Sequence, residues 1–62
     1  MWILKNNVIV NTDNISVIKM DSSGNLHFTL TGNAELRLED VPEDAIKQIC
    51  MAHKKGQDIV VF

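Results

Sequence analysis

The sequence predicts an α+β fold: a twisted antiparallel sheet of about five strands, followed by one C-terminal helix and a short terminal strand. Apolar and polar side chains alternate with a period near two over the first forty residues, which is typical of strands. The spacing becomes helical over residues 41–55, and residues 59–62 are an apolar run. The 62 residues suffice for a single domain, which we divide into a β-meander (1–40), the helix and the terminal strand (58–62).

Turn-forming residues divide the meander into strands. Asn6-Asn7 separates the first two apolar runs, because asparagine tolerates the positive φ angles that a tight hairpin requires. Residues 11–14 are a polar cluster whose side chains bond to their own backbone, and we expect the chain to bend there. Residues 15–20 form the next strand, and residues 21–25 form the turn that ends it. Since all the connections are short, we expect sequential antiparallel pairing.

The following two strands alternate most regularly. Leu26, Phe28 and Leu30 point to one face, and the residues between them are polar. After a Gly-Asn turn, residues 34–38 repeat this pattern. Such alternation indicates an antiparallel meander with one dry face and one solvated face.

The helix of residues 41–55 is predicted by its ends as well as by its spacing. Asp40 and Glu43 fit a capping box, and Pro42 suits the first turn of a helix. At the other end, Gly56 is a suitable C-terminal cap. Five residues share one face, which we expect to pack on the dry face of the sheet: Ala45, Ile46, Ile49, Cys50 and His53.

The chain ends on four consecutive apolar residues. A strand without alternation has both faces covered, or has one face covered by a partner, and its free edge can pair with another subunit. Chains below roughly 70–80 residues are commonly stabilised by disulfides, a metal or oligomerisation, and this chain has one cysteine. We therefore predict a homo-oligomer of two or more copies, joined through apolar strand edges. The expected interface residues are Trp2, Ile59, Val60, Val61 and Phe62.

Composition argues against several classes of protein. The net charge is −2 and the six Lys and Arg residues are scattered, which counts against nucleic-acid binding because counterion release needs clustered basic residues. No run approaches the ~18 apolar residues of a membrane span, and the first residues lack the features of a signal peptide. No Cys/His cluster supplies four zinc ligands. We expect a cytoplasmic protein without metal or other cofactor, whose partner is a second copy or another protein.

Cys50 and His53 are the first candidates for chemistry. They lie three residues apart on the predicted helix, so their side chains are neighbours, as a nucleophile and its base or two metal ligands would be. A reactive thiolate prefers a helix N-terminus, where the dipole stabilises negative charge, whereas Cys50 lies in the second half of the helix. We therefore expect a buried cysteine that behaves as a small hydrophobe, with His53 as a cationic partner of the helix C-terminus.

Other candidate sites have simpler explanations. His27 belongs to the polar face of its strand, opposite the face that meets the helix. The turn 21–25 carries oxygen atoms that suit calcium, but the twelfth position counted from Asp21, where an EF-hand needs Glu, is Gly32. No phosphate-binding loop, nucleophile elbow or HExxH helix is present. We expect a protein without catalytic activity.

Residues 8–18, with the sequence Val-Ile-Val-Asn-Thr-Asp-Asn-Ile-Ser-Val-Ile, resemble small flagellar-operon proteins of the FlbD type. The shared features are an apolar strand, an Asn turn and a second strand, followed by a Gly hairpin and a helix. The likeness covers roughly residues 8–52 and does not include the terminal strand. It implies a small bacterial accessory protein without catalytic residues.

Residues 1–4 and 23–26 resemble the opening strand and the central hairpin of the carbon storage regulator proteins. Those proteins are RNA-binding dimers with five strands and a helix. The positions of their RNA-contacting arginines hold Asn6-Asn7 and Glu39-Asp40 here. The resemblance therefore implies a shared layout without the basic residues that bind RNA.

These observations lead to one main functional hypothesis and two alternatives. The main hypothesis is a small interaction or regulatory module that acts as a homo-oligomer, from a bacterium or a mobile element. The first alternative is an RNA-binding regulator with a basic stripe across the oligomer, built from Lys5, Lys19, Lys54 and Lys55. The second is a sensor or sponge for a small anion held between subunits, where contacts between copies create pockets that one small domain lacks.

Overall fold

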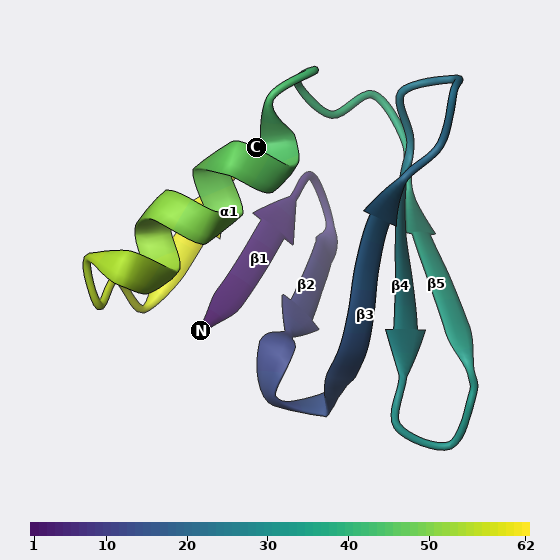
Figure 1. Cartoon of the computed structure of the whole chain (residues 1–62), viewed down its shortest axis with the longest axis horizontal. Helices are drawn as coiled ribbons and strands as arrows, with labels where there is room; N and C mark the ends of the chain where they lie inside the picture. The colour runs from purple at the N-terminus through teal and green to yellow at the C-terminus, as the bar shows by residue number, and fades with distance from the viewer.

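The computed structural model describes all residues 1–62 and shows an α+β fold with six strands and one α-helix (Figure 1). The strands form two three-stranded sheets, with the orders β2-β1-β6 (sheet A) and β3-β4-β5 (sheet B). The elements are β1 (Trp2–Lys5), β2 (Val8–Asn11), the 3₁₀ turn η1 (Thr12–Asn14), β3 (Ile15–Met20), β4 (Leu26–Leu30), β5 (Glu35–Leu38), α1 (Ala45–Lys54) and β6 (Ile59–Val61).

The α+β class is confirmed, but the prediction of one continuous five-stranded sheet is wrong. The polar cluster after β2 forms η1, in which the Asn11 side chain accepts a hydrogen bond from the backbone N–H of Asp13 at 3.0 Å. This turn takes the chain out of sheet A before β3 begins. The edge of β1 that β2 leaves free is occupied by β6, which runs parallel to β1.

Sheet A is built around β1. Its central residue, Ile3, lies opposite Val10 of β2 and Val60 of β6, and all three side chains are buried. Of the two alternatives for the terminal strand, coverage of both faces is wrong for a single chain, whereas coverage of one face by a partner stays a prediction. Val60 points into the protein, whereas Ile59 and Val61 on either side of it are exposed. Strand alternation is thus present in β6 although all its residues are apolar.

Sheet B confirms the alternation predicted for its strands. Leu26, Phe28 and Leu38 are buried on its inner face, and His27 and Arg37 lie on the other. An irregularity in the pairing of β3 and β4 occurs between Ile15 and Val17, where the register shifts. Figure 1 shows the three strands of this meander together on one side of the molecule, and α1 on the other.

Helix α1 is shorter than predicted at its start. Asp40 has a positive φ of 55°, and the N-cap residue is Asp44, which makes no capping hydrogen bond with its side chain. The first turn is closed by the carbonyl of Pro42, which accepts from the N–H of Ala45 at 3.0 Å. The predicted capping box of Asp40 and Glu43 is therefore wrong, because the chain turns too late for Asp40 to precede the helix directly.

The end of α1 confirms the predicted cap. Gly56 has a φ of 69°, and its N–H donates to the carbonyl of His53 at 3.2 Å. The next N–H, of Gln57, donates to the carbonyl of Ala52 at 3.0 Å. These two bonds are those of a Schellman motif, in which the left-handed conformation favours glycine.

The buried face of α1 differs from the predicted stripe. Ala45 and Ile49 are buried as expected, but the third buried residue is Ala52, whereas Cys50 is exposed and so is His53. Ala52 is 3 % exposed. The prediction of a buried cysteine is thus wrong. The core that joins both sheets to α1 consists of Ile3, Val10, Leu26, Phe28, Leu38, Ala45 and Ile49.

Ile49→Asp should unfold the protein. Ile49 is 6 % exposed within this core, and an unpaired buried carboxylate costs more than ~4 kcal/mol. The whole fold is stabilised by only roughly 3–9 kcal/mol at 0.05–0.15 kcal/mol per residue. Circular dichroism should show loss of the cooperative thermal transition. The matched control is Lys47→Asp, at an exposed position of the same helix, and a wild-type melting curve for Ile49→Asp would contradict this core.

Candidate interaction surface

The outer face of sheet A is apolar. The register of the strands places Trp2 between Asn11 and Ile59, and Leu4 between Ile9 and Val61. Because side chains alternate across a strand, these six residues share the face opposite the buried row through Ile3. Asn11 is the only polar residue among them, and none is charged.

The exposure of this face sets it apart from an ordinary protein surface. Val61 is 63 % exposed, Ile9 57 %, Ile59 47 % and Trp2 43 %. Scattered apolar residues are normal on a surface, but contiguous ones mark interaction sites. Here the exposed side chains belong to three adjacent strands, so they form one patch. We call these six residues, Trp2, Leu4, Ile9, Asn11, Ile59 and Val61, the apolar face.

Loose folding does not explain this exposure. The accessible surface of the chain is 4308 Å², near the ~4,000 Å² expected for a compact monomer of its mass. Helix α1 contacts β6 and β3, and it packs on the buried side of the sheets. The apolar face is therefore uncovered because every described element packs elsewhere.

One edge of sheet A is also free, along β6. The N–H of Trp2 donates to the carbonyl of Asp58, and the N–H of Phe62 donates to the carbonyl of Leu4, both at 2.8 Å. Asp58 and Phe62 thus turn their backbone groups toward β1, so those of Ile59 and Val61 point away from it. A groove of about 330 Å³ runs beside this edge, between β6 and the side of α1 that carries Met51.

The structure distributes the predicted interface residues over two environments. Trp2, Ile59 and Val61 lie on the apolar face, whereas Val60 is buried and Phe62 packs, half-buried, against the core. Sequence reasoning missed Leu4 and Ile9. The two-residue turn at Asn6-Asn7 pairs Leu4 with Ile9. The register of this hairpin could therefore have placed both residues on the same face as Trp2.

The remaining candidates do not all meet in one place, because Cys50 and His53 line the same groove and His27 does not. Cys50 and His53 are exposed on α1, and His27 lies on sheet B, as alternation predicts. No group of three or more His, Cys, Asp or Glu side chains is arranged to hold a metal ion. Lys5 is the last residue of β1, at the end of the strand that is remote from Met1. Lys54, in contrast, lines the same groove as Met1. Lys5 and Lys54 thus lie apart within one chain, and the stripe predicted across an oligomer stays a prediction.

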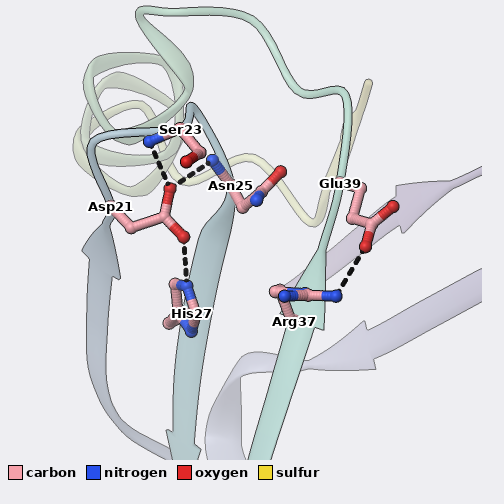
Figure 2. A network of polar contacts seen from close by, with 6 residues as sticks. All are labelled: Asp21, Ser23, Asn25, His27, Arg37 and Glu39. Carbon is pink, nitrogen blue, oxygen red and sulfur yellow. Dashed lines mark hydrogen bonds and ion pairs between the residues drawn. The ribbon is translucent and has the colours of Figure 1, made fainter.

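The outer face of sheet B is polar, in contrast to sheet A. Lys19, His27 and Arg37 lie opposite one another in one row across its three strands. His27 Nε2 and Asp21 Oδ2 are 2.6 Å apart, and the guanidinium of Arg37 donates to Glu39 at 2.7 Å (Figure 2). A partner of this sheet would have to replace these contacts.

Asp21 organises the turn between β3 and β4 (Figure 2). Its Oδ1 accepts from the backbone N–H groups of Ser23 at 2.8 Å and Asn25 at 3.0 Å. The hydrogen bond to His27, together with these backbone bonds, lowers the pKa of Asp21 from 3.8 to about 2. The oxygen atoms of residue 21 are thus engaged by the turn itself, which confirms the predicted hairpin.

Comparisons with models of known protein families, with curated proteins and with solved structures found no match to this chain. The ten residues of α1 are too few to cross a lipid bilayer.

Asp21→Asn should weaken the pH dependence of stability in acid. Because the pKa of Asp21 is depressed in the folded state, its contribution is fully present above pH ~4 and is lost as the pH falls toward 2. Urea midpoints measured between pH 5 and pH 2 should fall less steeply for this variant than for the wild type. Asp13→Asn, in exposed η1, should keep the wild-type slope; equal slopes for all three proteins would contradict the role of Asp21.

Proposed function

We propose that this protein is a non-catalytic interaction module of the cytoplasm, which forms a homodimer by packing its apolar face against the same face of a second copy. The observation that supports this proposal is the six-residue apolar face, which spans all three strands of sheet A and carries no charge. Dimerisation would join two such sheets into a sandwich, whose facing layers lie about 10 Å apart.

A second copy fits this face better than a charged partner does. A two-fold axis through the patch sets apolar side chains against apolar side chains and brings no like charges together. Trp2 and Leu4, on the central strand, lie in the middle of the patch, where an aromatic anchor contributes most to binding. The charged row of Lys19, His27 and Arg37 lies on sheet B and stays outside this contact.

The size of the face sets the expected strength of the dimer. Three strands of about three residues give a footprint of roughly 14 Å by 10 Å, which is small beside the ~800 Å² per partner of a standard interface. We therefore expect a weak, reversible dimer and not a permanent one. Such a module responds to its own concentration, and this property suits a regulatory role.

Ile9→Lys tests the proposal, with Val17→Lys as its matched control. Both residues are β-branched, about half exposed and on edge strands, but Ile9 belongs to the apolar face and Val17 to the outer face of sheet B. Burial of one isoleucine is worth ~1.5–3 kcal/mol, and a dimer carries the change twice. Sedimentation equilibrium should show the dissociation constant raised at least roughly a hundredfold for Ile9→Lys and unchanged for Val17→Lys.

A variant on β6, at the other edge of sheet A from Ile9, distinguishes packing through the apolar face from pairing through the β6 edge. Val61→Lys should weaken the sandwich as Ile9→Lys does, because both residues are on the apolar face. If Val61→Lys abolished association and Ile9→Lys did not, the copies would be joined through the β6 edge, and face-to-face packing would be wrong. A wild-type protein that remained monomeric at millimolar concentration would overturn the proposal altogether.

A further inference from the structure

A second groove lies on another side of α1, away from the apolar face. It has a volume of about 370 Å³ and is lined by Met1, by Thr12 of η1, by Ile18 of β3 and by residues of α1. The helix residues here are Ile49, Cys50, His53 and Lys54, whereas the groove beside β6 uses Met51 and Ala52. The two grooves thus flank α1 on different sides.

The walls of this groove are apolar. Ile49 belongs to the buried core, and Met1 and Ile18 are half-buried and pack against it. The hydroxyl of Thr12 donates to the carbonyl of Met1 at 2.8 Å, so it offers no free donor to an occupant. Since the inner walls present few free polar groups, they suit an alkyl chain.

The ionisable side chains of the lining are all basic or neutral. His53 and Lys54 lie at the end of α1, Cys50 lies one turn earlier, and no Asp or Glu lines the groove. Both ion pairs of the protein, Asp21–His27 and Arg37–Glu39, are on sheet B. Lys54 is therefore an exposed cation without an acidic partner, next to an apolar hollow.

From this combination we infer that the groove binds a small amphipathic monoanion, of which a medium-chain carboxylate is the simplest representative. The alkyl chain lies between Ile18 and Ile49, and the carboxylate accepts hydrogen bonds from Lys54 and His53. The volume is at the lower end of the range for ligand pockets, which limits the chain to roughly six to ten carbons. This site is separate from the apolar face and does not depend on the proposed dimer.

A series of straight-chain carboxylates from butanoate to decanoate tests the inference by titration calorimetry. Burial of a methylene is worth ~0.8 kcal/mol, which corresponds to an approximately fourfold fall in the dissociation constant for each added carbon. The fall should stop once the groove is filled. Octanol, which matches octanoate in length but lacks the charge, should bind at least about fivefold more weakly.

Lys54→Gln and Lys55→Gln are the matched pair of variants. The two lysines are adjacent and exposed, but only Lys54 lines this groove, so both variants should keep the wild-type melting curve. Lys54→Gln should lower the affinity for octanoate to that for octanol, and Lys55→Gln should leave it unchanged. Octanoate should also slow the alkylation of Cys50 by neutral iodoacetamide in Lys55→Gln, and not in Lys54→Gln at the same concentration.

Four results would overturn the inference. They are the absence of saturable binding below the micellar concentration, an affinity independent of chain length, equal affinity for octanol, and equal loss in both lysine variants. NMR adds a direct control: the amide signals of Ile18 and Cys50 should shift with octanoate. If they shifted instead with protein concentration alone, the occupant would be a second copy and the ligand assignment would be wrong.

Discussion

The row formed by Ile3, Val10 and Val60 across sheet A is the constraint on which this structure depends. Ile3 is fully buried, and its neighbours on both sides are residues of β2 and β6. Once these three side chains point into the core, alternation leaves the residues before and after them outside. Five of those six residues are apolar, and the exception is Asn11. A chain that buries this row therefore presents a mostly apolar outer face, which the proposed dimer covers.

Local features of the fold were predictable from sequence, whereas the pairing of distant strands was not. Alternation identified the inner residues of β4, and the glycine after α1 gave the correct cap. Periodicity says nothing of which strand lies beside which, so the parallel contact of β1 with β6 and the division into two sheets were missed. The helix stripe was placed by helical spacing, which did not show that Ala52 is buried and Cys50 exposed.

The same distinction holds for the candidate surface. The terminal apolar run drew attention to Ile59 and Val61, and Trp2 was singled out near the start of the chain; the structure places all three on one face. The sequence alone did not indicate that Leu4 and Ile9 belong to this face, because each lies within a short apolar run. The strand register is what places them there. The groove near Cys50 was beyond sequence reasoning, because residues from the start of the chain, β3 and α1 line it together.

The parallel contact of β1 with β6 also has a kinetic consequence. Trp2 lies opposite Ile59, so this pairing closes a loop that contains nearly the whole chain. The entropy of closing that loop costs about 2 kcal/mol more than the entropy of closing the short β3–β4 hairpin. High contact order slows folding. The meander of sheet B is local enough to form early, and sheet A is completed by the docking of β6. In a newly synthesised or partly unfolded molecule, the edge of β1 that pairs with β6 would therefore be exposed. Aggregation through this edge would compete with the final step of folding.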